Sequence, residues 1–167
     1  MSGFNLNNQM AGSYQALSST YKTITRVVAA ASAPRRVRYV EMDWSAVSVP
    51  NSTDCQIQAD LTYCGATGAG TGTAATPWPQ DSGTVAATQV DTAISTGLVN
   101  CSAEPTTFVQ ADCWYNRGFN QRSGVLWQSS PGHEIIAPAV VSAGPGMRAL
   151  STNYTGNVVA RAIFDEL

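Results

Sequence analysis

Two acidic residues, Glu41 and Asp43, have the spacing that best suits catalysis in this sequence. They stand two positions apart in a segment of alternating polarity, so their side chains share one strand face about 7 Å apart. An inverting glycoside hydrolase needs such a separation, because one carboxyl protonates the leaving oxygen while the other activates a water. Strand faces routinely carry paired acids, however, and no further residue converges on these two. We therefore expect a surface pair and no catalytic residues.

Nucleophilic catalysis has one candidate base, His133, which is the only histidine. A serine or cysteine nucleophile needs a base beside it, and the chain contains no G-x-S-x-G elbow. His133 directly follows the turn-forming residues Ser130-Pro131-Gly132 and precedes an apolar run. We expect it to lie on the surface at the start of a strand.

The stretch CGATGAGTGTAATPWPQDSG, residues 64–83, has glycines spaced like those of a phosphate-binding loop. A mononucleotide loop also needs a lysine after its last glycine, but the only lysine, Lys22, precedes the stretch. A dinucleotide loop needs a following helix, which Pro77 and Pro79 oppose. The sequence therefore predicts a polar connection between strands, and no bound cofactor.

The four cysteines, Cys55, Cys64, Cys101 and Cys113, contain no C-x-x-C pair. This spacing gives no zinc or redox motif, so we expect no metal. Cys64 and Cys101 flank the excursion of residues 65–100. If one disulfide forms, we expect it to join these two cysteines and to close residues 65–100 into a covalent loop.

Most of the chain after residue 20 alternates between apolar and polar side chains, which is typical of antiparallel strands with one buried face. In residues 36–47, Met42 and Trp44 share one predicted face and Tyr39 lies on the other. In residues 54–64, the odd positions are predicted to face the core and the even ones the solvent. The expected strands are residues 20–30, 36–47, 54–64, 107–115, 123–128, 133–137, 146–150 and 157–164.

These elements predict an all-β fold, namely an antiparallel, jelly-roll-like β-sandwich of about eight to nine strands. Residues 84–95 fit either a short helix or an irregular crossing. Residues 1–19 show no period and are expected to form an extended N-terminal arm, with the sandwich domain spanning residues 20–167. A chain of 167 residues is long enough for one such domain.

Charged residues make up only 12% of the chain, about half the usual share, and the net charge is -2. With this charge the chain has no broad positive potential to attract phosphates, so we expect no nucleic-acid partner. No apolar run is long enough to cross a bilayer, and the N-terminus lacks the pattern of a secretory signal. We expect a protein made in the cytoplasm and not bound to a membrane.

Two groups of residues are candidates for contact with a partner. Trp78, between two prolines, and Trp114 are the tryptophans expected to be exposed, whereas Trp44 and Trp127 fit the core. Three arginines, Arg35, Arg36 and Arg38, cluster at the start of a strand. They could pair with carboxylates of a partner, or they could discourage aggregation at an edge strand.

Several short motifs of the chain occur in the same order in a known class of protein. They are GTGTAATPWPQD (70–81), EPTTF (104–108), NQRSGVLWQSSPGHEIIAPAVVSAGPGM (120–147) and VVARAIFDEL (158–167). In this respect the chain resembles small virion proteins of tailed bacteriophages, of the capsid decoration or cement type, over roughly residues 34–167. The four cysteines and the longer N-terminal segment depart from that pattern.

The resemblance implies a non-enzymatic subunit made in the host cytoplasm that binds the outside of the phage head. Its partner would be the major capsid protein, and it would be a homo-oligomer, with a trimer favoured. The alternative is a tail- or fibre-associated sandwich that recognises a cell-surface glycan through Trp78 and Trp114.

Overall fold

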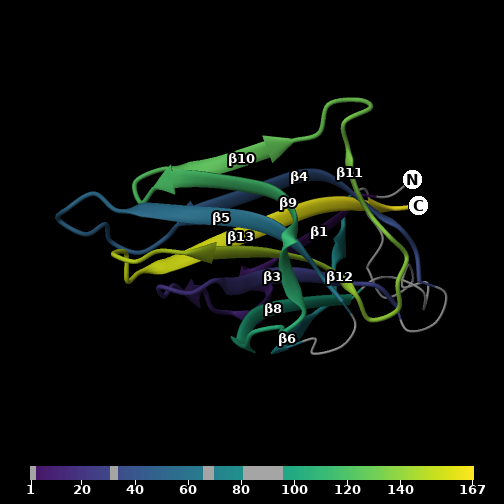
Figure 1. Ribbon diagram of the computed structural model, residues 1–167, viewed down its shortest axis with the longest axis horizontal. Coiled ribbons are helices and arrows are strands. Elements are labelled where there is room, and N and C mark those ends of the chain that lie inside the picture. Colours follow the sequence, from purple (N-terminus) through teal and green to yellow (C-terminus); the bar gives the residue numbers. More distant parts are fainter. Residues whose placement is uncertain (1–2, 31–33, 66–69, 81–95) are drawn as a thin grey trace.

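Two antiparallel sheets packed face to face form the computed structural model, which describes residues 3–30, 34–65, 70–80 and 96–167 (Figure 1). Sheet A has the strand order β10-β4-β13-β1-β7, with β11 also paired to β4 and β2 to β13. Its strands are β1 (Phe4–Asn7), β2 (Gln15–Ala16), β4 (Val37–Ala46), β7 (Trp78–Pro79), β10 (Gly124–Gln128), β11 (Ile135–Ala137) and β13 (Asn157–Glu166).

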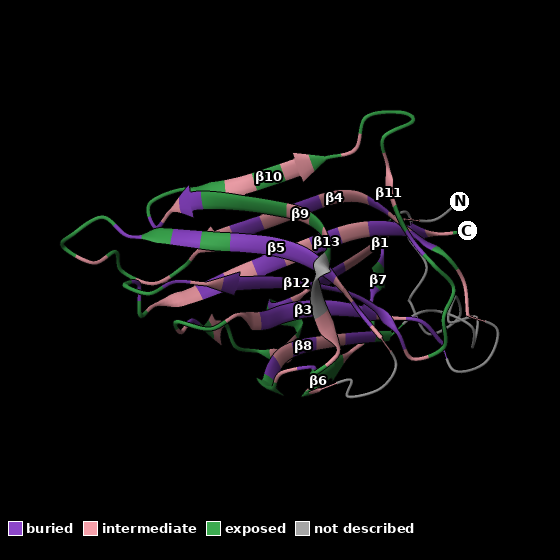
Figure 2. Ribbon diagram, viewed as in Figure 1, coloured by how far each residue is buried: buried purple, intermediate pink, exposed green. Residues whose placement is uncertain are grey.

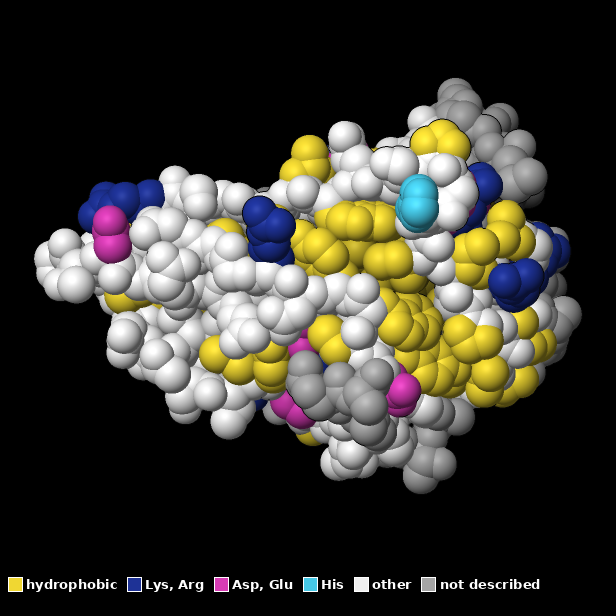
Figure 3. Space-filling model, turned by 45° about the horizontal axis from the view of Figure 1, so that its top comes forward, with side chains coloured by type: hydrophobic (Ala, Val, Ile, Leu, Met, Phe, Trp, Pro, Cys, Tyr) yellow, Lys and Arg dark blue, Asp and Glu magenta, His cyan; other side chains and the backbone are white. Residues whose placement is uncertain are grey.

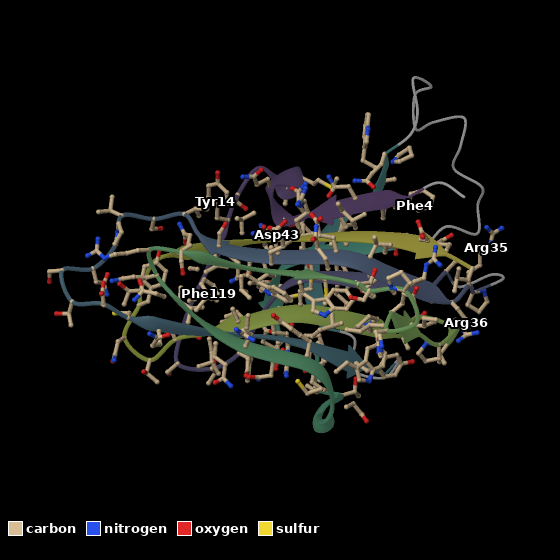
Figure 4. All side chains as sticks on the ribbon, turned by 90° about the horizontal axis from the view of Figure 1, so that it is seen from above. Phe4, Tyr14, Arg35, Arg36, Asp43 and Phe119 are labelled. Carbon is tan, nitrogen blue, oxygen red and sulfur yellow. The ribbon has the colours of Figure 1, made fainter. Side chains whose placement is uncertain are left out.

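Sheet B has the order β6-β8-β3-β12-β5-β9. Its strands are β3 (Lys22–Val28), β5 (Gln56–Cys64), β6 (Thr71–Ala75), β8 (Thr96–Ala103), β9 (Phe108–Asn120) and β12 (Gly144–Leu150). A single 3-10 turn, η1 (Asn8–Ala11), completes the described elements. The two sheets are seen edge-on as separate layers in Figure 4.

The predicted all-β sandwich is confirmed, and each of the eight expected segments contains a strand. The described strands number thirteen rather than eight or nine. The additional ones are short or interrupted by glycine, so the sequence shows no long alternation there. Residues 84–95, which fitted either a helix or a crossing, lie outside the described residues.

The core lies between the sheets and is filled by apolar side chains from both, as the buried bands on the central strands show (Figure 2). Strands form here because β-branched and aromatic residues alternate with polar ones, which suits a pleated sheet with one dry face. The largest fully buried apolar side chains are Trp44, Tyr39, Tyr154, Phe164, Leu6, Ile24, Met42, Ile57, Leu61 and Met147.

The predicted N-terminal arm is not confirmed. Residues 4–7 form β1, which lies inside sheet A between β13 and β7. Leu6 is fully buried, and the buried Asn8 side chain bonds the β13 backbone, donating to the Val158 carbonyl and accepting from the Ala160 N–H at 3.0 Å. This strand could not be recognised from the sequence, because β1 contains only two apolar residues, Phe4 and Leu6.

The predicted faces of β4 need a correction. Tyr39, expected opposite Met42 and Trp44, is fully buried together with them. The pairing with β13 shifts by one residue between Glu41 and Tyr39, which leaves Val40 as an extra residue in β4. A bulge of this kind reverses which residues face the core.

The predicted solvent face of β5 also needs a correction, because Asp60 and Thr62 are buried. The connection from β8 to β9, residues 104–107, and the first residue of β9, Phe108, cross the outer face of sheet B in front of β3 and β12 (Figure 1). Glu104 accepts hydrogen bonds from the backbone and hydroxyl of Thr23 on β3 at 2.8 and 2.7 Å, and the Phe108 ring lies over Gly146 on β12. We call residues 104–108 the crossing strap.

Candidate binding surface

The two exposed tryptophans that the sequence singled out do not share a site. Trp78 lies on β7 at one edge of sheet A and is 56% exposed. Trp114 lies on β9, at the edge of sheet B that the short β9–β10 turn joins to the opposite edge of sheet A, and is 36% exposed. The structure therefore exposes both side chains as expected but separates them across the width of the sandwich.

The three clustered arginines also have separate surroundings. Arg35 and Arg36 precede β4 at the end of the sandwich that carries the two chain termini (Figure 4). Arg38 pairs with Asp165 of β13 through Nη2 and Oδ2 at 2.5 Å, and this contact raises the pKa of its guanidinium. Because Arg38 pairs with Ile136 of β11 on one side and with Asp165 of β13 on the other, it does not protect a sheet edge.

The candidate carboxylate pair is held by an arginine. Arg161 on β13 donates from Nε to Asp43 at 2.6 Å and from Nη2 to Glu41. Gln128 donates to the other oxygen of Glu41 at 2.9 Å. A guanidinium bound to both carboxylates occupies the space where a glycosidic oxygen would stand, so the geometry is that of an ion-pair cluster on the outer face of sheet A.

All four cysteines are free thiols in the structure, including the predicted pair Cys64 and Cys101. Cys64 belongs to β5 and Cys101 to β8, and β12 and β3 lie between these strands. Neighbouring strands are about 4.8 Å apart, which puts the two backbones about 14 Å apart. A disulfide needs α-carbons within about 7 Å, so this pair cannot close without moving the sheet.

Cys101 should resist alkylation in the folded protein. Burial, together with the negative charge of Glu104, raises the pKa of its thiol to about 12, so the reactive thiolate is scarce at pH 8. The half-buried Cys113 should react first with iodoacetamide, with Cys101 modified only in denaturant. Mass spectrometry of peptides after timed alkylation measures this order, and equal rates for the two thiols in native buffer would contradict it.

A cluster of aromatic side chains lies at the joined β9–β10 edge, where the core reaches the surface. We call Tyr63, Trp114, Tyr115 and Trp127 the aromatic row. Tyr63 stacks on Trp114 with ring centroids 5.5 Å apart, and Tyr115 packs against Trp127 at 6.4 Å. Beneath them, the fully buried Trp44 stacks on Tyr115 at 5.7 Å. The row is therefore anchored to the core at one point and reaches solvent at Trp114.

An irregularity in β9 brings these rings together. The pairing runs from Leu61–Tyr115 to Thr62–Cys113, so Trp114 is an extra residue without a partner in β5. At a bulge, adjacent side chains no longer alternate strictly between the two faces. Trp114 can thus stack on Tyr63 while its neighbour Tyr115 faces the core.

The aromatic row lies in a weakly charged environment. Burial raises the pKa of both Tyr63 and Tyr115, which keeps their hydroxyls neutral over the physiological range. Among charged side chains, the buried Arg26 acts most on Tyr63, where the exposed Asp112 also acts, and the exposed Arg117 acts on Tyr115. Figure 3 shows hydrophobic side chains gathered on this face of the molecule, next to the single histidine. The surface combines an apolar centre with a polar rim, as protein interfaces do.

Sequence reasoning found only part of this surface. It identified Trp114 and assigned Trp127 to the core, against which this partly buried ring does pack, but it did not connect Tyr63 or Tyr115 with either tryptophan. The adjacent aromatic residues Trp114 and Tyr115 were the available signal, because strict alternation cannot bury both.

Within the described ranges, no three His, Cys, Asp or Glu side chains are grouped so that they could hold a metal ion. No described helix is long and apolar enough to span a membrane. Comparison of the chain with known protein families, with curated proteins and with solved structures finds no match.

Proposed function

We propose that this protein is a non-enzymatic structural subunit of a bacteriophage virion that binds the outer surface of the head as a decoration or cement protein. The observation that carries the proposal is the aromatic row, a half-exposed group of large rings fixed on paired strands. Tyrosine and tryptophan in such a setting dominate the energy of protein interfaces, since they bury much area and lose little conformational freedom. On this proposal the sandwich is of the jelly-roll type.

The distribution of charge supports a covering role. On the surface, acidic side chains hold Arg38, Arg122 and Arg161 in ion pairs within the chain. Binding another protein over a surface whose charges are already paired costs less desolvation free energy than binding over isolated charges, because fewer unpaired ions lose their hydration. The partner that fits is the major capsid protein of the head.

The proposal includes self-association, with a trimer favoured, because decoration subunits cover symmetric joints between shell proteins. It also includes a location on the capsid exterior. Strands paired into two packed sheets provide the rigidity that such a covering subunit needs, as the extensive core of buried side chains indicates.

The direct test is co-sedimentation of the purified chain with heads of the phage that encodes it, prepared without this protein. We expect saturable binding at many copies per head. Replacement of Trp114 by alanine should weaken binding about 30-fold, which corresponds to about 2 kcal/mol for an interface anchor.

Leu126→Ala provides the matched control, because Leu126 is also exposed on the β9–β10 edge but pairs with Asp43 on the outer face of sheet A. It should bind as the unmodified protein does. A chain that is monomeric and does not bind heads would overturn the proposal.

A second candidate function is glycan recognition by a tail- or fibre-associated subunit. The exposed Trp114 ring, supported from behind by Tyr63, offers the flat apolar face on which a sugar ring can stack. Asp112 and Arg117 would then supply hydrogen bonds to hydroxyl groups. A few copies per particle, with glycan binding that Trp114→Ala abolishes, would favour this candidate over the first.

A further inference from the structure

We infer that the loop of residues 47–55, between β4 and β5, is a preformed docking knob whose tip, Val49, inserts into an apolar pocket of the capsid protein. The inference rests on the proposed function and adds a second contact to it, separate from the aromatic row. We call residues 47–55 the β4–β5 loop.

The β4–β5 loop presents apolar side chains to solvent. Val49 is 89% exposed, and the flanking Val47 and Pro50 are exposed as well. The loop projects beyond the ends of the sheets, at the opposite end of the molecule from the two chain termini (Figure 1). Single exposed apolar residues are common on protein surfaces, so exposure alone would carry no argument.

The second observation is that a buried side chain fixes the backbone of this exposed loop. Gln121 is only 2% exposed, and both the oxygen and the nitrogen of its side-chain amide form hydrogen bonds with the loop. Its oxygen accepts from the Asn51 N–H at 3.0 Å, and its nitrogen donates to the carbonyls of Asn51 and Thr53 at 3.2 and 2.9 Å. The Gln121 backbone N–H donates to the Cys55 carbonyl at 3.0 Å.

Other segments brace the loop from outside. Asn51 donates from its side chain to the Asn153 carbonyl at 2.9 Å, and Ser48 accepts from the Asn157 N–H at 2.8 Å. Arg122 donates to the Asn51 carbonyl at 3.2 Å and to the Asp54 carboxylate at 2.7 Å. The loop is thus tied to the β9–β10 turn and to the turn that precedes β13.

These bonds hold Val49 out in water instead of letting it fold back onto the sandwich. Fixing a backbone costs conformational entropy, and here the fixed tip buries no apolar surface of its own in return. Rigidity of this kind favours binding, because a loop already in its bound shape loses less freedom when the partner arrives. The exposed Arg122–Asp54 pair beside the tip supplies a polar rim. The occupant that fits is therefore a pocket of apolar side chains with hydrogen-bonding groups at its mouth.

The experiment compares three variants with the unmodified protein by co-sedimentation with heads prepared without it. Val49→Ser shortens the apolar tip and leaves every brace intact. It should weaken binding about tenfold or more, as expected when a buried valine is lost from an interface, with the melting temperature unchanged. Val140→Ser is the matched control, because Val140 is 44% exposed in another loop, and it should bind normally.

Gln121→Ala tests the requirement for a preformed loop. Because Gln121 is buried and cannot touch the partner, weaker binding by this variant at a temperature where it remains folded would show that the brace matters. Normal binding by Gln121→Ala would overturn the preformed character of the knob.

Normal binding by Val49→Ser would overturn the knob itself while leaving the proposed function in place. Absence of binding by the unmodified protein would instead overturn the proposed function, and the capsid contact of the knob with it.

Discussion

Replacement of Asp60 by alanine should lower the free energy of unfolding by about 3–5 kcal/mol, because it leaves a buried arginine without its counter-ion. Asp60 and Arg148 form a bidentate ion pair beneath the crossing strap, with nitrogen–oxygen distances of 2.8 and 2.6 Å. The Arg148 guanidinium also donates to Thr62 at 2.9 Å and lies 4.4 Å from the ring centres of both Tyr21 and Phe108. Chemical denaturation followed by tryptophan fluorescence measures the loss.

The reciprocal variant, Arg148→Met, separates charge from packing. Burial raises the pKa of the Asp60 carboxyl, so once Arg148 is absent the folded protein holds this proton more tightly than the unfolded chain does. Its loss of stability should therefore be small near pH 4 and grow as the pH rises toward 7. Asp60→Ala should show no such recovery, because a guanidinium cannot give up its proton in this range. A loss in Arg148→Met that does not change with pH would contradict this account.

Replacement of Arg26 by methionine should cost about 3 kcal/mol, because it removes several hydrogen bonds to buried carbonyl groups. Arg26 is fully buried on β3. Its guanidinium donates to backbone carbonyls of two separate segments, at Cys64 and Gly65 on one side and at Ser142 and Gly144 on the other, over 3.2–3.4 Å. A methionine fills similar space but leaves these acceptors unsatisfied.

Arg117→Met is the control for Arg26→Met, since Arg117 is exposed on β9. Its unfolding free energy should change by no more than about 0.5 kcal/mol, as is usual for surface positions. Thermal unfolding of the two variants in parallel would show a clear separation of midpoints. Equal midpoints would mean that Arg26 contributes no more to stability than a surface arginine does.

The architecture could be predicted from the sequence because alternation and turn residues are local signals. Residues 54–64 alternate without interruption and form β5, and the Pro and Gly turns after residue 128 separate β10, β11 and β12 as expected. What alternation cannot reveal is whether the second face of a strand is covered. Asp60 and Thr62 were expected in solvent, but the Arg148 side chain of β12 binds both, and the rings of Tyr21 and Phe108 cover its guanidinium.

The candidate site was predictable only in part, since it depends on the bulge at Trp114 and on which strands lie at sheet edges. Trp114 was identified by its type, but its stack on Tyr63 requires the extra residue in β9. The separation of Trp78 from Trp114 follows from sheet order, which one sequence does not contain. The same is true of Cys64 and Cys101, whose strands have two others between them.

The place of β13 in sheet A has a consequence for biosynthesis. This strand pairs with β4, β1 and β2, yet it is translated after all three. Until residues 157–166 are made, β4 can pair only with β10 and β11, and β1 only with β7, so the two halves of sheet A stay apart. A chain cut short before β13 would lack the central strand of that sheet, so we expect such a truncated product not to fold and to be degraded.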